Sequence, residues 1–143
     1  MTYEYALPDN LWLVEMDRVQ MNLAIRNVLA NASESMPDGG VIKVAGENVL
    51  APPLVNVPGT LMKEGPYVKI SITDHGTGIP KDILDKIFDP YFSTKAHGSQ
   101  KGLGLGLTAA HSIIEKHHGW ITVKSETGVG TIVHIYLPAC GRP

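Results

Sequence analysis

The sequence has little that would hold it together covalently or attach it to a charged or lipid partner. Its 143 residues include one cysteine, Cys140, which excludes a disulfide framework and a paired-cysteine metal site and is consistent with a reducing compartment. The net charge of -2 argues against a nucleic-acid binder held by bulk electrostatics. No apolar run approaches the ~20 residues of a membrane-spanning helix, and the opening "MTYEYALPDN" lacks the basic residue and apolar core of a signal peptide. We therefore expect one cytoplasmic domain, residues 1–143, with no nucleic acid partner and no direct membrane contact.

The first part of the chain predicts two short strands and a long helix. Two β-prone runs, residues 3–7 and 11–15, flank "PDN" and predict a hairpin. The helix is expected to begin after Asp17 as its N-cap and to end at "PDGG", residues 37–40. Apolar residues at three- and four-residue spacing give it one buried face: Met21, Ile25, Val28, Leu29, Ala32 and Met36.

The middle of the chain predicts two strands and a short helix. After a strand at residues 41–45, the four prolines of residues 46–66 predict a long surface loop or a hairpin excursion. Residues 67–74 alternate apolar and polar side chains, as a half-buried strand does. Pro80 suits the first turn of a short helix. The buried side of that helix is expected to carry Ile83, Leu84 and Ile87.

The last part predicts a loop at residues 89–101, a second long helix and a closing hairpin around "ETGVG". Gly119 is the expected C-terminal cap of the helix, and the adjacent His117–His118 pair is read as a surface cap cluster and not as a metal site. The buried face of the helix is Leu107, Ala110, Ile113, Ile114 and His117. Helices interleaved with short-turn strand pairs favour an α+β fold, a two-layer α/β sandwich whose mixed β-sheet is covered on one face by helices.

Asp74 is the first candidate for a functional group. By strict alternation it shares the buried face of Val68, Ile70 and Ile72, where a carboxylate costs several kcal/mol unless hydrogen bonds are donated to it. The chain then turns through "HGTGIP". One interpretation is the floor of a pocket in which Asp74 accepts a hydrogen bond from a flat ligand. The alternative is an ordinary turn, because Asp followed by Gly is common at strand ends.

Asn27 and Asn31 are the second candidate pair. They lie four residues apart on the flank of the apolar stripe of the first long helix, although asparagine is a poor residue for a helix interior. An amide oxygen is a hard, neutral ligand that suits a Mg²⁺ ion bound to phosphates. The alternative is a solvated helix edge.

The glycine run "KGLGLGL" is the third candidate. It lacks the GxxxxGK[ST] spacing of a Walker A loop, and the polar "AHGSQK" before it is not the strand that a dinucleotide fingerprint needs. What remains is a set of bare backbone N–H groups at a helix start, which can hold an anion. The alternative is a plain flexible loop.

Four segments, in this order, resemble the ATP-binding catalytic domain of sensor histidine kinases. "NVLANASESMPDGG" resembles the asparagine box, "DHGTGIP" the first glycine box, "IFDPYFSTK" the phenylalanine box and "KGLGLGL" the second glycine box. "SETGVGTIVHIYLP" resembles the closing hairpin of the family. The resemblance covers nearly the whole chain and implies the Bergerat-type ATP-binding fold.

The resemblance also implies roles for matching positions. Asp74 would take the adenine amino group above Gly78, and Asn31 would hold Mg²⁺. Asn27, Asn31 and Lys95 are the catalytic residues that it implies. The positions that it assigns to ATP binding are Asn27, Asn31, Asp74, Gly76, Gly78, Ile79, Phe88, Thr94, Lys95, Gly102, Leu103, Gly104, Leu105, Gly106, Leu107 and Thr131.

Two segments bear on how this site would work. Residues 93–103 are expected to form a short lid that becomes ordered on nucleotide, because they are rich in glycine and lack periodic apolar residues. Where many relatives have a basic residue soon after the second asparagine, this chain has Ser33, Glu34 and Ser35, so a phosphate contact from that position is not expected.

The resemblance implies a kinase that holds Mg-ATP and donates the γ-phosphate to a histidine on a separate dimerisation domain, from which a response regulator receives it. None of the six histidines has the setting of a phosphoacceptor, so the acceptor is expected outside this chain and the isolated domain is expected to be a monomer. Two alternatives remain: a stand-alone ATPase or anti-sigma serine kinase of the same superfamily, and a nucleotide-binding module without turnover. Asn27 disfavours hydrolysis, because hydrolytic relatives carry a glutamate there to orient water.

Overall fold

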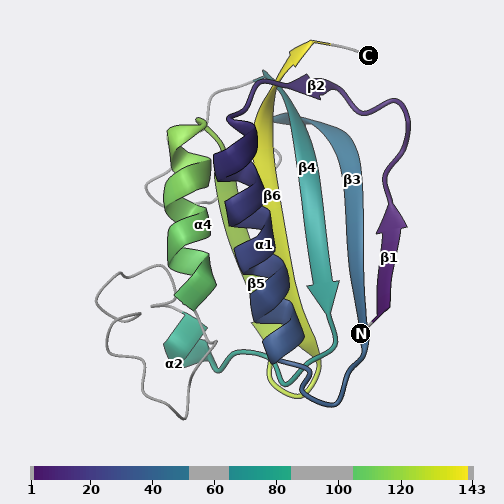
Figure 1. Cartoon of the computed structure of the whole chain (residues 1–143), viewed down its shortest axis with the longest axis vertical. Helices are drawn as coiled ribbons and strands as arrows, with labels where there is room; N and C mark the ends of the chain where they lie inside the picture. The colour runs from purple at the N-terminus through teal and green to yellow at the C-terminus, as the bar shows by residue number, and fades with distance from the viewer. Residues whose placement is uncertain (1, 52–64, 85–104, 142–143) are drawn as a thin grey trace.

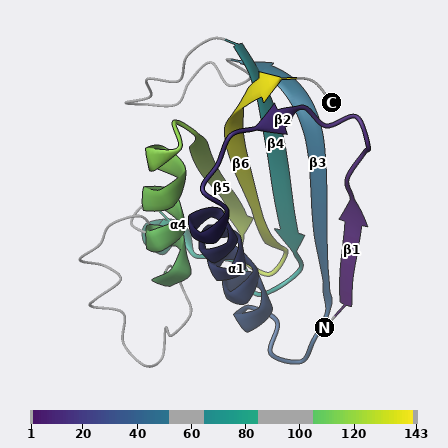
Figure 2. The ribbon, with the colours of Figure 1, turned by 45° about the horizontal axis from the view of Figure 1, so that its top comes forward.

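The computed structural model describes residues 2–51, 65–84 and 105–141. In these residues one mixed sheet forms a layer, and the helices α1 (Arg18–Glu34) and α4 (Leu105–Lys116) form a second layer on one of its faces (Figures 1 and 2). A short helix, α2 (Lys81–Leu84), follows Pro80, whose carbonyl accepts a hydrogen bond from the Leu84 N–H at 2.8 Å. The predicted two-layer α+β architecture is confirmed.

The sheet has the order β1-β3-β4-β6-β2, and β5 also pairs with β6, on the edge opposite β4. Its strands are β1 (Thr2–Ala6), β2 (Leu13–Val14), β3 (Val41–Ala51), β4 (Gly65–Asp74), β5 (Trp120–Glu126) and β6 (Gly130–Gly141). Only the pairing of β1 with β3 is parallel among the described strands. The central strand β4 therefore lies between β3 and β6, and its last residue, Asp74, is paired with Thr131 of β6.

The predicted hairpin of residues 3–7 and 11–15 is wrong. β1 pairs with β3, whereas β2 pairs with the end of β6, so the two strands do not pair with each other. The side chain of Asn48 on β3 holds the connection between them, because it accepts from the Trp12 N–H and donates to the Asn10 carbonyl, both at 2.9 Å. This contact comes from far along the chain, where local turn chemistry gives no sign of it.

Residues 46–66 belong to a hairpin as far as they are described. β3 continues past the predicted end at residue 45 to Ala51, and its ladder with β4 runs to the pair Ala51–Gly65. The hairpin alternative is thus correct for both ends of the excursion, while residues 52–64 lie outside the described part.

Helix α1 begins as predicted. The side chain of Asp17 accepts a hydrogen bond from the Gln20 N–H at 3.0 Å and so caps one of the free amides of the first turn. The buried core between the helices and the sheet consists of Met21, Ala24, Val28, Ala32, Met36, Ile42, Val44, Ile72, Ile79, Leu107, Ala110, Ile114, Ile121, Val133, Ile135 and Leu137. The predicted faces of α1 and α4 agree with this core, and the partly buried residues that pack against it include Ile25, Leu29, Ile70, Leu84 and Ile113. The side chains of Ile83 and Ile87, predicted for the buried side of the short helix, lie outside the described part.

Helix α4 ends where it was predicted to end, but by a different cap residue. His118, and not Gly119, takes the left-handed conformation, with φ 62°. The N–H groups of His118 and Gly119 donate to the carbonyls of Glu115 and Ile114, both at 2.9 Å, in the pattern of a Schellman motif. Gly119 is required for another reason: a Cβ there would overlap the carbonyl oxygen of Tyr136.

His117 ties the end of α4 to the beginning of α1. Its Nδ1 lies 2.8 Å from the Ile113 carbonyl, which can only accept, and its Nε2 accepts from the Asp17 N–H at 2.9 Å. Both contacts are satisfied at once by the neutral tautomer that carries its proton on Nδ1. Of the two residues in the expected cap cluster, the half-buried His117 therefore makes a tertiary contact with α1, whereas His118 is exposed.

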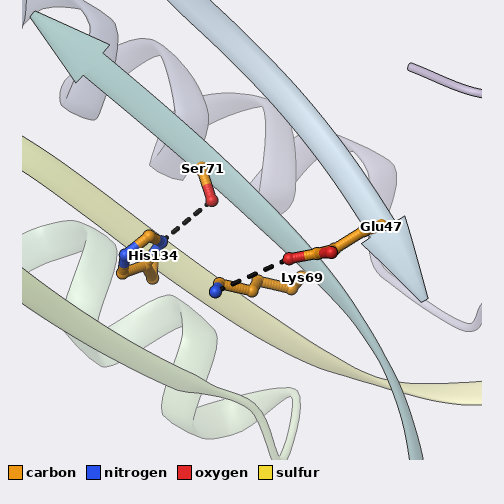
Figure 3. A network of polar contacts seen from close by, with 4 residues as sticks. All are labelled: Glu47, Lys69, Ser71 and His134. Carbon is orange, nitrogen blue, oxygen red and sulfur yellow. Dashed lines mark hydrogen bonds and ion pairs between the residues drawn. The ribbon is translucent and has the colours of Figure 1, made fainter. Parts of the chain in front are cut away.

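The face of the sheet away from the helices carries a polar network (Figure 3). The Ser71 hydroxyl lies 2.8 Å from Nδ1 of His134, and Lys69 forms an ion pair with Glu47 at 3.6 Å. Both are direct cross-strand pairs. The Lys69 ammonium also lies 5.8 Å from the centre of the Tyr136 ring, within cation–π range.

The stability of the domain is expected to fall at mildly acid pH because of His134. Burial lowers the pKa of this imidazole, and the positive charges of Lys69 and Lys124 lower it further. A proton then binds the unfolded chain more readily than the folded one, so the stabilisation is complete above the unfolded pKa of about 6.5 and is lost as pH falls through it. Urea unfolding from pH 8 to pH 5 should show a steeper loss for the wild type than for His134→Gln. An equal pH dependence of the unfolding free energy in the two proteins would contradict the role given to His134.

Candidate nucleotide site

Asp74 lies at the end of β4 on the side of the helices and is only 5% exposed. One carboxylate oxygen accepts from the Gly76 N–H at 2.9 Å. Burial raises the pKa of Asp74, and hydrogen bonds from Gly76, Ser35 and Thr131 offset part of this rise. The carboxylate is thus placed where it was predicted, and a donor from a ligand would relieve part of its remaining desolvation.

The segment after Asp74 is held between two other parts of the fold. On one side Gly76 packs against Ser35 at the end of α1, whose carbonyl accepts from the Thr77 N–H at 3.3 Å. On the other side the Thr77 carbonyl accepts from the Gly128 N–H at 2.8 Å, which ties the segment to the β5–β6 turn. The loop after β4 therefore bridges the end of α1 and the closing hairpin.

Gly78 has a structural reason to be glycine. Its φ is 78°, and a Cβ would overlap the backbone carbonyl of Glu126. Gly76 is likewise constrained, since a Cβ there would overlap Ser35. These contacts account for both glycines without a ligand, and the predicted packing of an adenine ring on Gly78 stays a prediction.

Asn31 carries an oxygen that suits a metal ion. In the described part of the chain its Oδ1 is buried and has no hydrogen-bond partner, although the side chain as a whole is only half-buried. A buried amide oxygen without a donor costs free energy, and a hard cation such as Mg²⁺ would satisfy it. Asn27 lies one turn earlier on α1 and is also half-buried.

Ser35, at the end of the helix α1 that carries Asn27 and Asn31, connects this helix to Asp74. Its N–H donates to the Asn31 carbonyl at 3.2 Å, and its hydroxyl is one of the hydrogen-bonding groups that lower the pKa of Asp74. The same hydroxyl lies 2.7 Å from the Ala32 carbonyl, and because it has one proton it can donate to only one of these two acceptors at a time. Ser35 thus makes a neutral contact between two of the segments that were predicted to form the site.

The other predicted site residues divide into three groups. Ile79 and Leu107 are buried in the hydrophobic core, so their side chains pack within the protein and only their backbone could meet a ligand. Leu105 and Gly106 form the first turn of α4. The remaining positions lie outside the described residues: Phe88, Thr94, Lys95, Gly102, Leu103 and Gly104, together with the expected lid at residues 93–103.

A hollow of about 330 Å³ opens at the same end of the sheet and touches Asp74, Ser125 and Thr131. Three of its other walls are Thr73, Lys124 and Ile132, which by strand alternation point away from the helices. Since Asn31 lies on the helix side, this hollow is distinct from a site that would use both Asn31 and Asp74.

Ser35 and Ser125 were missed as contact residues by the sequence reasoning. Ser125 could have been found by the argument that found Asp74, because it shares the inward parity of Ile121 and Val123 on its strand. Ser35 had no such signal, since its contact depends on how the end of α1 meets the loop after β4.

The chain belongs to the family of histidine kinase-, DNA gyrase B-, and HSP90-like ATPases, which matches residues 16–140. It is 40% identical over 129 residues to the sensor kinase CckA of Brucella abortus (strain 2308), covering 90% of this chain and 13% of that protein. It is 38% identical over 130 residues to the sensor histidine kinase ZraS of Escherichia coli (strain K12), covering 91% of this chain and 24% of ZraS. The chain thus spans a quarter or less of either relative.

Solved structures agree with the family assignment. The mycobacterial sensor histidine kinase MprB matches with a TM-score of 0.68 and 28% identity, over 98% of this chain and 83% of that one. The catalytic domain of histidine kinase ThkA, in a nucleotide-free form, matches with a TM-score of 0.69 and 27% identity, over 96% and 78%. The resemblance to the catalytic domains of sensor histidine kinases is confirmed. No helix among residues 2–51, 65–84 and 105–141 has the length and apolar character to cross a membrane.

Proposed function

We propose that this domain binds Mg-ATP and donates its γ-phosphate to a histidine on a separate dimerisation domain, as a protein-histidine kinase of a two-component system. The observation that carries the proposal is the presence of two buried acceptors on the helix side of the sheet: the carboxylate of Asp74, whose pKa is raised by burial, and Oδ1 of Asn31, which has no hydrogen-bond partner among the described residues. Ser35 joins the elements that carry them. One acceptor suits the amino group of a base and the other suits the cation that accompanies its phosphates.

Each group would have a defined part in the site. Asp74 would accept from the 6-amino group of adenine, which places the base at the end of β4. Asn31 would hold Mg²⁺, which neutralises charge on the phosphates when bound. Asn27 and Lys95, with the backbone of residues 102–107, would position the phosphates. Phosphoryl transfer depends mostly on such positioning and charge stabilisation.

Asn27 also bears on the fate of the bound nucleotide. A carboxamide is not basic enough to take a proton from water at neutral pH, so we expect ATP to persist until an acceptor arrives. The acceptor would be a histidine on a dimerisation domain of the parent protein, and a response regulator would then take the phosphate. The isolated domain is proposed to be a monomer that works in the cytoplasm.

A trans-phosphorylation assay tests this function. The chain, Mg²⁺ and ATP labelled in the γ-phosphate are mixed with the dimerisation domain of the parent protein, and with a control in which its acceptor histidine is replaced by alanine. The expected product is an acid-labile, base-stable phosphate on the first partner only. Brisk release of phosphate without any partner would instead establish a hydrolytic ATPase, and tight binding without transfer would establish a nucleotide-binding module.

A further inference from the structure

The Ser125 hydroxyl joins three parts of the site. It accepts from the Ile79 N–H at 2.7 Å, lies 3.1 Å from the Gly130 carbonyl and lies 2.8 Å from Oγ1 of Thr131. Ile79 belongs to the loop after Asp74, whereas Gly130 and Thr131 begin β6. Ser125 therefore lies where the loop that follows Asp74 meets the closing hairpin.

The protons of these groups fix the direction of each hydrogen bond. A hydroxyl has one proton to donate and two lone pairs to accept with. The Ile79 amide can only donate, so it uses one lone pair of Ser125, and the Gly130 carbonyl can only accept, so it uses the proton. All three contacts are satisfied only if Thr131 donates its own proton to the second lone pair of Ser125.

The Thr131 hydroxyl is then left with acceptor capacity alone. Thr131 is paired with Asp74 across the β4–β6 ladder, and each residue is only 5% exposed. The buried end of the ladder thus presents two neighbouring acceptors, a carboxylate and a hydroxyl whose proton is already used. This pair of acceptors fits a ligand group that carries two N–H donors. The same pair repels a carbonyl oxygen at that position of a ligand.

We propose that Ser125 is a positioning residue that makes the site select a 6-amino purine over a 6-oxo purine, by holding the Thr131 hydroxyl as an acceptor. The inference rests on the proposed adenine site and adds to it a second determinant beside Asp74. Without Ser125 the Thr131 hydroxyl can rotate and donate, so that a carbonyl at the 6-position becomes tolerable to it.

The experiment compares ATP with ITP, which differs from ATP in carrying a 6-oxo group in place of the 6-amino group. Calorimetry with Mg²⁺ gives the ratio of the two dissociation constants for the wild type, Ser125→Ala and Ser125→Thr. The preference for ATP should fall about fivefold in Ser125→Ala, the size of one neutral hydrogen bond. It should stay at the wild-type value in Ser125→Thr, which keeps the hydroxyl. Because each ratio is measured within one protein, a general loss of folded protein cancels.

The same comparison in the Thr131→Val variant shows whether Ser125 acts on nucleotide preference through Thr131 or only supports the fold. In Thr131→Val, which has no hydroxyl to orient, adding Ser125→Ala should leave the ratio unchanged. An equal loss of ATP and ITP affinity in Ser125→Ala would overturn the role of Ser125 while leaving the adenine site intact. A wild-type chain that binds neither nucleotide would overturn the proposed function together with this inference.

Discussion

Asp74→Asn is expected to weaken ATP binding by an order of magnitude or more. The carboxylate is buried and accepts at least one hydrogen bond, and a lost charge-assisted hydrogen bond to a ligand is worth ~1.5–3 kcal/mol. Calorimetric titration with Mg-ATP measures the change. Guanine nucleotides should bind the wild type poorly, because guanine presents a carbonyl oxygen where adenine presents an amino group.

Asp74→Asn is expected to be more stable to unfolding than the wild type at neutral pH, although it binds ATP more weakly. The two effects therefore distinguish a loss of binding from a loss of folding. Since burial raises the pKa of Asp74, ionisation is less favourable in the folded chain than in the unfolded one. The free energy of unfolding therefore decreases as pH rises through the unfolded pKa of about 3.9 and the higher folded one, and at neutral pH the neutral amide of Asp74→Asn avoids this loss. Asp82→Asn, an exposed carboxylate on α2, is the matched control and should bind ATP normally. Equal affinity of the wild type for ATP and GTP would disprove the adenine contact.

Gly78→Ala is expected to destabilise the domain by about 2–5 kcal/mol, the sum of a left-handed backbone and a collision with the Glu126 carbonyl. Gly128→Ala provides a matched control, because Gly128 has a similar φ of 83° but nothing within 4 Å of an added Cβ. It should cost only the conformational part, about 1–2 kcal/mol.

Urea unfolding followed by tryptophan fluorescence gives both values for the two glycine variants. The difference between the two losses of unfolding free energy measures the cost of the contact between the loop after β4 and the β5–β6 turn. Equal losses would show that the turn moves aside without cost, and that the loop is not held between α1 and the hairpin. For a domain of ordinary stability, ~5–15 kcal/mol, the loss expected at Gly78 is large enough to raise the unfolded population measurably.

Local periodicity was sufficient to predict the helices, the central strand and the buried position of Asp74. The reason is that a period of two or of three to four residues directly reports which face is buried. The same alternation would have placed Ser125 inward. It could not show that Ser125 and Thr131 contact each other, because that depends on the register of the closing hairpin.

The errors came from contacts between distant segments. Asn48 draws the connection between β1 and β2 onto β3, and the β3–β4 ladder extends beyond the predicted strand. At the end of α4, His118 takes the left-handed conformation of the cap, while the predicted cap residue Gly119 lies close to the Tyr136 carbonyl. For β1, β2 and β3 a tertiary contact decided the outcome, and local sequence patterns do not report such contacts.

The pairing of Asp74 with Thr131 has a consequence for the order in which the domain can assemble during synthesis. When β4 leaves the ribosome, α1 and β3 are already available to it, but β6 is not yet made. Until the closing hairpin is complete, β4 is an edge strand, and the loop after Asp74 lacks every contact that Ser125, Glu126 and Gly128 provide. A nascent chain that stops short of Gly130 therefore has the Asp74 carboxylate and the helix α1, but not the completed β5–β6 hairpin beside them. The proposed ligand site is thus complete only when the last strand has been made.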